Sequence, residues 1–460
     1  MISLPSIVLI DDNKEDLDTI QDSFIRMGYP CFPIHYQGDE PDNDSGIDHV
    51  NLDMIKPRII ISDLNLQELQ KVDEKQLAGP IATVLQKLPL SGPFILYFWS
   101  RNARTVEPVM AVIYERYKDI PYPIHWGVLD KTQFKSGQLD LKEQVAAIMK
   151  ESSVFEALCN WECRVSTAAQ KTTDSLFSLA RVPEPSGLDN FKDKTTEKLQ
   201  AMLAVIGNET LGVQNAAADP DAAIELGLAP VLHDHISSIR SKGYSDFWRD
   251  SVPSIGTEIP LDKEVATKLN SFCHVEEVGS DYSKGCRGVF LELAADVLVD
   301  PDKRKKIESR FGASLDTIID EEFLVQIAKE HQRALVRSAT KIGFVEISAE
   351  CDQAQKKTKL HRYVIAALTP LKYTPEGEAA FELYGKHNKK SHNGIYRVPD
   401  ISLGGIDYML QLSFKYQIGS LPHENSWLGN SLLRLRDQIM VDISFNCAQY
   451  ISRPGIIAFK

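Results

Sequence analysis

The stretch Arg58-Ile59-Ile60-Ile61-Ser62-Asp63-Leu64-Asn65-Leu66 joins a short apolar run to a carboxylate. An isoleucine run without polar alternation predicts a strand buried on both faces, as in a parallel sheet covered by helices. A second apolar run, residues 7–10, ends in the same way on Asp11 and Asp12. Because functional groups of open α/β sheets gather beyond the carboxyl ends of the strands, we expect these two acids and Asp63 to share one sheet edge.

Two later apolar runs complete the pattern. Residues 94–99 are followed by Ser100, and residues 124–129 are followed by Asp130 and Lys131. An acid pair, a single Asp, a hydroxyl and a Lys, each after a successive strand, resembles the receiver domain of response regulators. The resemblance covers residues 1–150 and implies a doubly wound α/β domain with a parallel five-stranded sheet.

The resemblance also implies roles for these residues. Asp63 would be the phosphoacceptor, Lys131 would contact the phosphoryl oxygens, and Ser100 would hydrogen-bond one of them as the conformational switch. A carboxylate that attacks a phosphoryl group needs a cation to offset charge repulsion, and Mg²⁺ prefers oxygen ligands. The implied Mg²⁺ ligands are Asp11, Asp12, Asp63 and the backbone carbonyl of Asn65.

The chain departs from the family's usual pattern close to these positions. The residues after Asp63 lack the usual Pro and Gly, and Arg101 stands where a small residue is common. Val128 occupies the place of a frequent switching aromatic, and Thr132 replaces a Pro. These departures concern access to the site and switching more than metal binding.

Size and composition indicate an ordinary globular protein. The 460 residues are enough for about three domains, with 43% apolar and 25% charged residues. The seven cysteines form no CxxC pair, which argues against a zinc site or a disulfide framework. Because no apolar stretch is long enough to span a bilayer, we expect a soluble cytoplasmic protein of bacterial type without a membrane partner.

Helical periodicity from residue 140 onwards predicts a long helix that ends at the Pro- and Gly-rich residues 182–187. Such a helix could couple a receiver to its output or form a homodimer, or it could simply pack on the next domain. The predicted domains are a receiver-like domain (1–150), a linker helix and boundary (151–187), a mainly helical domain (188–340) and a small α+β, barrel-like domain (341–460). In these last two domains, residues 288–299 and 431–450 are predicted helices, and residues 343–348, 362–368 and 408–418 are predicted strands.

Acidic and nucleophilic side chains gather between two predicted strands of the last domain: Glu346, Glu350, Cys351 and Asp352. Acids with neighbouring lysines could serve a metal-dependent nuclease, and Cys351 could act as a nucleophile if His361 or His423 lay beside it. The alternative is that Cys351 is a buried small residue and that Asp352 caps the turn.

The leading interpretation is a response regulator of a bacterial phosphorelay, phosphorylated on Asp63 by a histidine kinase or a phosphotransfer protein. Receivers fused to unfamiliar outputs resemble those of conflict or defence systems. The alternatives are a receiver-gated hydrolase or nuclease and a phosphate-independent pseudo-receiver scaffold. With a net charge of −13 and only a weakly basic last third, the chain does not indicate nucleic-acid binding.

Overall fold

A computed structural model describes residues 6–38, 47, 50–67, 73–100, 103–130, 143, 147–148, 150–181, 188–238, 244–327, 329–374, 381–383 and 394–452. The chain forms two compact units. The first comprises Met1–Ser178 and Val231–Thr257, and the second comprises Leu179–Pro230 and Glu258–Lys460.

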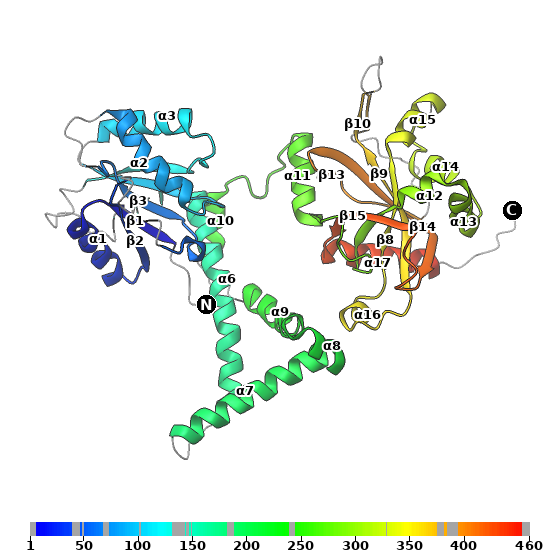
Figure 1. Cartoon of the computed structure of the whole chain (residues 1–460), viewed down its shortest axis with the longest axis horizontal. Coiled ribbons are helices and arrows are strands. Elements are labelled where there is room, and N and C mark those ends of the chain that lie inside the picture. Colours follow the sequence, from blue (N-terminus) through cyan, green and yellow to red (C-terminus); the bar gives the residue numbers. More distant parts are fainter. Residues whose placement is uncertain are drawn as a thin grey trace. The chain divides into compact units, whose positions relative to one another are not determined.

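The first unit is built on a parallel five-stranded sheet, as predicted (Figure 1). The strands follow the order β2-β1-β3-β4-β5, so the chain reverses direction across the sheet after β2. They are β1 (Ile7–Asp11), β2 (Cys31–His35), β3 (Ile59–Asp63), β4 (Ile95–Trp99) and β5 (His125–Leu129).

Helices cover both faces of this sheet, which explains why its strands are continuous apolar runs. Alternate strand residues point to opposite faces. On one face Val8, Ile60 and Leu96 pack with α2 (Glu74–Lys87) and α3 (Val106–Arg116). On the other face the intervening residues pack with α1 (Lys14–Arg26) and with Phe155 of α6 (Ser153–Ala180).

The long helix α6 confirms the predicted helix over residues 153–180, whereas residues 131–142 lie outside the described part of the chain. Arg58, just before β3, makes a bidentate pair with Glu162 of α6, with N–O distances of 2.8 and 3.1 Å. Farther along α6, Thr172 Oγ1 lies 2.9 Å from His235 Nδ1 at the end of α9 (Pro220–Ser238). The short turns η1 (Leu52–Met54) and η2 (Ala103–Thr105) and helix α10 (Tyr244–Ser251) complete this unit.

The second unit contains a curled antiparallel sheet in the order β12-β14-β9-β8-β7-β15-β6, with β13 also paired to β14 (Figure 1). A register irregularity between Ser413 and Gln417 interrupts the pairing of β14 with β9 and lets the long strand bend. The strands are β6 (Val275–Glu277), β7 (Val289–Leu293), β8 (Lys341–Glu346), β9 (His361–Pro370), β12 (Ile395–Arg397), β13 (Ile401–Leu403), β14 (Ile406–Ser420) and β15 (Leu428–Leu435), and β10 (Lys372–Tyr373) pairs with β11 (Phe381–Glu382).

Helices of the second unit precede the sheet, connect its strands and close the described chain. They are α7 (Leu188–Leu211), α8 (Val213–Ala218), α11 (Lys263–His274), α12 (Ala295–Val299), α13 (Pro301–Phe311), α14 (Leu315–Ile318), the π-helical turn η3 (Ile319–Phe323), α15 (Glu330–Ala339), α16 (Glu350–Ala354) and α17 (Asp437–Ser452). In the described part of the chain, no helix is long and apolar enough to cross a membrane.

One predicted helix is wrong in its first half, and the helix predicted over residues 431–450 is confirmed only from Asp437 onwards. Residues 288–299 form strand β7 and then the short α12, and residues 431–435 belong to β15 before α17 begins at Asp437. The side chains of both stretches pack against neighbouring strands, and this tertiary pairing overrides the helical pattern. Strands β6 and β7 precede residue 341, so that predicted domain boundary cuts through one continuous sheet.

Candidate metal centre

An acid cluster lies at the carboxyl edge of the parallel sheet. Asp11 ends β1, Asp12 follows it, and Asp63 ends β3. Strands β1 and β3 are parallel neighbours, so their carboxyl ends reach the same edge. Carboxylate oxygens of the three residues all lie within 4.8 Å of one another. The structure therefore brings together the three acids that the sequence placed on one edge.

The backbone holds two of these carboxylates in place. Asp11 is fully buried, and its Oδ1 accepts a 2.9 Å hydrogen bond from the amide of Asn13. Asp63 is half-buried, and its Oδ1 accepts a 2.9 Å hydrogen bond from the amide of Leu64. Asn13 also caps α1 by accepting from two amides of its first turn. The cluster is thus oriented by the same turn that starts the first helix.

The donor set fits a hard divalent cation. Three ionised carboxylates at this separation repel one another, and a bound cation removes that repulsion. Carboxylate and carbonyl oxygens suit Mg²⁺, Ca²⁺ or Mn²⁺, whereas thiolate-preferring metals would need cysteine. Asn65, whose carbonyl is the predicted further ligand, is half-buried two residues after Asp63.

Of the two predicted phosphoryl-contact residues, only Ser100 lies in the described part of the chain. Trp99, the last residue of β4, is the register partner of Asp63, and Ser100 follows it at the same edge. Ser100 is half-buried, and its amide donates a 3.1 Å hydrogen bond to the carbonyl of Leu129. Lys131 lies outside the described residues, as does Arg101.

Sequence reasoning missed a histidine beside the cluster. His35 ends β2 and is the register partner of Asp11. Its Nε2 lies 3.0 Å from the backbone carbonyl oxygen of Asp12, and its Nδ1 lies 3.3 Å from the side-chain amide nitrogen Nε2 of Gln37. Because that amide can only donate, Nδ1 is the acceptor and Nε2 carries the proton that is donated to Asp12. The visible signal was that the second strand also ends on a polar residue at this edge.

Behind the cluster, an aromatic ring on β4 lies directly over β5. A Cβ atom at Gly127 would lie 2.7 Å from Cε1 of Tyr97, so only glycine fits beneath this ring. Burial, with a smaller contribution from Glu151, raises the pKa of Tyr97 to about 12. Val128, at the position of the common switching aromatic, is half-buried.

The predicted C-terminal residues differ in burial and in partners. Glu346, at the end of β8, is fully buried, and its Oε1 lies 3.0 Å from Nδ1 of His361. Its Oε2 accepts a 3.1 Å hydrogen bond from the amide of Ser348. Burial raises the pKa of Glu346, against the opposing effects of Ser348 and His361. This carboxyl group therefore lies in the sheet interior, paired with His361.

The neighbouring residues lie on α16 and face solvent. Glu350 Oε2 is 3.5 Å from Nη1 of Arg287, and Cys351 Sγ is 3.9 Å from Oδ1 of Asp352. Cys351 is exposed, so the interpretation that it is a buried small residue is wrong. In the described parts of the chain, the acids at 346, 350 and 352 do not converge into a metal-binding group.

Comparison of the chain with protein-family models, with curated proteins and with solved structures gives no match.

Proposed function

We propose that the first unit is a response-regulator receiver that accepts a phosphoryl group on Asp63 in the presence of Mg²⁺. The observation that carries the proposal is the convergence of Asp11, Asp12 and Asp63 at the carboxyl edge of a parallel sheet with the order β2-β1-β3-β4-β5. Ligands of open α/β sheets bind at such an edge, where the strand order reverses.

The chemistry follows from the positions of the acids. A carboxylate oxygen of Asp63 attacks the phosphorus of a phosphohistidine on a histidine kinase or phosphotransfer protein. The new P–O bond forms as the P–N bond breaks, and the imidazole leaves with the electron pair of that bond. Asp11, Asp12 and the Asn65 carbonyl would hold Mg²⁺, which offsets negative charge between nucleophile and phosphoryl group.

The difference in burial favours the half-buried Asp63 over the fully buried Asp11 as the phosphoacceptor. Asp11 is fully buried, so its carboxylate is the less accessible of the two to a phosphodonor. Asp63 is partly exposed at the end of its strand. A phosphoryl group there adds roughly −1.5 to −2 charges and several strong acceptor oxygens, which biases the surrounding loops toward a second arrangement.

We assign the output of the receiver to the second unit, and we propose that α6 forms a homodimer contact. Helix α6 exposes apolar side chains at Val154, Trp161 and Phe177, with exposed fractions of 42%, 47% and 46%. Exposed apolar side chains on a 28-residue helix support a homodimer contact there. A role in conflict or defence and a hydrolase or nuclease activity of the output remain predictions from the sequence.

The test is intact-mass analysis after incubation with Mg²⁺ and acetyl phosphate. We expect the wild type to gain one hydroxylamine-labile phosphoryl group, Asp63→Ala to gain none, and Asp18→Ala to behave as the wild type. Asp18 is a suitable control because it is an exposed acid that pairs with Lys14 on α1. An adduct that persists in Asp63→Ala would overturn the assignment, as would a wild type that binds neither the phosphoryl group nor beryllofluoride.

A further inference from the structure

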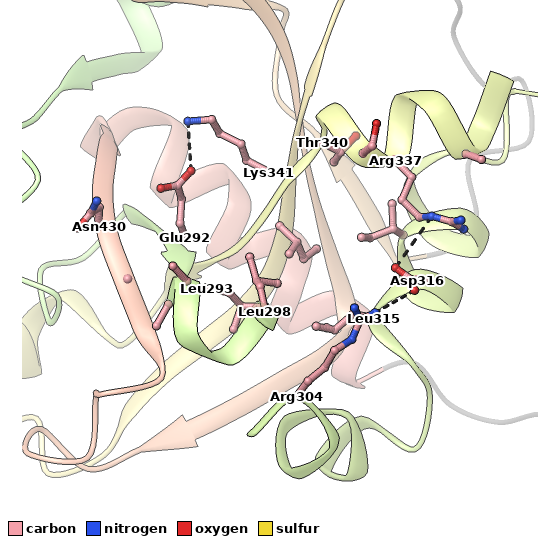
Figure 2. A pocket seen from close by; sticks show the side chains of 17 residues that line it. Glu292, Leu293, Leu298, Arg304, Leu315, Asp316, Arg337, Thr340, Lys341 and Asn430 are labelled. Carbon is pink, nitrogen blue, oxygen red and sulfur yellow. Dashed lines mark ion pairs between the residues drawn. The ribbon is translucent and has the colours of Figure 1, made fainter. Parts of the chain in front are cut away.

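The second unit contains a cavity of about 650 Å³ between helices α12 to α15 and strands β7, β8 and β15 (Figure 2). Its apolar lining includes Leu293, Leu315 and Ile342, which belong to the buried core. Leu298 of α12 also lines the cavity but remains 43% exposed. Cavities of a few hundred Å³ with an apolar lining and a few polar groups are typical small-molecule sites.

Charged side chains flank this apolar lining on two sides. Arg304 and Arg337 approach Asp316 from different helices, with Arg304 Nη2 at 2.9 Å and Arg337 Nε at 3.9 Å from its carboxylate (Figure 2). Elsewhere on the rim, Lys341 Nζ lies 3.1 Å from Oε1 of Glu292. The charged lining residues are therefore three cations and two acids in a protein of net charge −13.

Two further acids hold the arginines in place without lining the cavity. Glu308 Oε1 accepts from Arg304 Nε at 2.9 Å, and Asp320 accepts from Nη1 of Arg337. Among the described residues, Nη1 of Arg304 and Nη2 of Arg337 have no hydrogen-bond acceptor. Guanidinium groups that are already oriented, with donors still unused, are suited to bind an acceptor group without further ordering.

We propose that this cavity binds a small amphipathic monocarboxylate. Its apolar body would lie on Leu298 and Leu315, and its carboxylate would take the unused donors of Arg304 and Arg337. A single charge fits better than a polyanion, because the three acids around the two guanidinium groups already exceed their positive charge by one. This site lies within the second unit, and the inference does not depend on phosphorylation of the first.

The test uses 4-phenylbutanoate as the probe and 4-phenylbutylamine, which has the same apolar body and a positive charge, as the matched control ligand. Calorimetric titration of the full-length protein should show saturable binding of the carboxylate and none of the amine at equal concentration. Replacing Arg337 by Gln should weaken carboxylate binding about tenfold, the loss expected for one charge-assisted hydrogen bond.

A cavity-filling variant locates the site independently of charge. Ala334 lines the cavity from the exposed side of α15, so Ala334→Phe should fill it without disturbing the core. The matched control is Gln332→Phe, which adds a similar ring to the same helix at a position outside the lining. Binding abolished by Ala334→Phe alone would support the proposal. Absent carboxylate binding, equal binding of the amine, or binding unchanged in Ala334→Phe would each overturn it.

Discussion

Replacement of Asp63 by Asn should make the first unit more stable without Mg²⁺ and less responsive to it. The three carboxylates lie within 4.8 Å of one another, which corresponds to a repulsion of about 3.5 kcal/mol per ionised pair at an effective dielectric constant of about 20. In bulk water the same pair would repel by about 0.9 kcal/mol. Because two of the acids are half-buried, we expect a gain of about 2 kcal/mol in the variant, or roughly 4–8 °C in Tm for a unit of this size.

The response to Mg²⁺ provides the second half of this prediction. For a dissociation constant of about 1 mM, about 10 mM Mg²⁺ would stabilise the wild type by roughly 1.4 kcal/mol. Asp63→Asn keeps the acceptor for the Leu64 amide but loses a charged ligand, so this stabilisation should nearly vanish. Differential scanning calorimetry with and without Mg²⁺ measures both effects, and Asp18→Asn is the exposed control. Equal Mg²⁺ stabilisation in Asp63→Asn and the wild type would refute the reasoning.

Three further predictions concern single contacts. His35→Ala should weaken Mg²⁺ binding in calorimetric titration by several-fold, whereas His35→Gln, which can still donate to the backbone carbonyl of Asp12, should restore it. Equal affinities in His35→Ala and the wild type would rule out a positioning role. Gly127→Ala should lower the free energy of unfolding in urea by about 1–3 kcal/mol, because the added Cβ would clash with Tyr97. The control is Gly79→Ala in helix α2, where the added Cβ has space. This variant should leave the free energy of unfolding unchanged or raise it by up to about 1 kcal/mol. Because burial raises the folded-state pKa of Glu346, the stability that its protonated form contributes below about pH 4 is lost as pH rises through that raised pKa. Glu346→Gln should therefore flatten the decline of the unfolding free energy as the pH rises above about 4. Parallel pH profiles for variant and wild type would contradict this sign.

The parallel sheet was predictable because each of its strands is a local apolar run. The runs that end at Asp11, Asp63 and Ser100 needed no knowledge of their partners to be recognised as buried strands. The acid cluster was predictable for the same reason, since parallel neighbours necessarily end at one edge. The contact of His35 with Asp12 was not, because it depends on the position of β2 next to β1.

The second unit shows where local pattern fails. Residues 289–293 and 431–435 belong to segments predicted as helices, yet each pairs with strands far away in the chain. Cys351 carries no local sign of exposure, and Glu346 carries none of burial, because the packing of other segments decides both. The cavity beside Arg304 and Arg337 likewise depends on helices and strands that are distant in sequence.

The sequence by itself determined the parallel sheet, its helical layers and the edge on which three acids meet, because hydrophobic periodicity and strand ends are properties of short segments. Tertiary structure alone decided the strand partners of the antiparallel sheet, the pairing of Glu346 with His361, and the charged rim of the cavity. Those features depend on contacts between residues far apart in the chain, and long-range pairing is set by the packing of the whole unit and not by local preference.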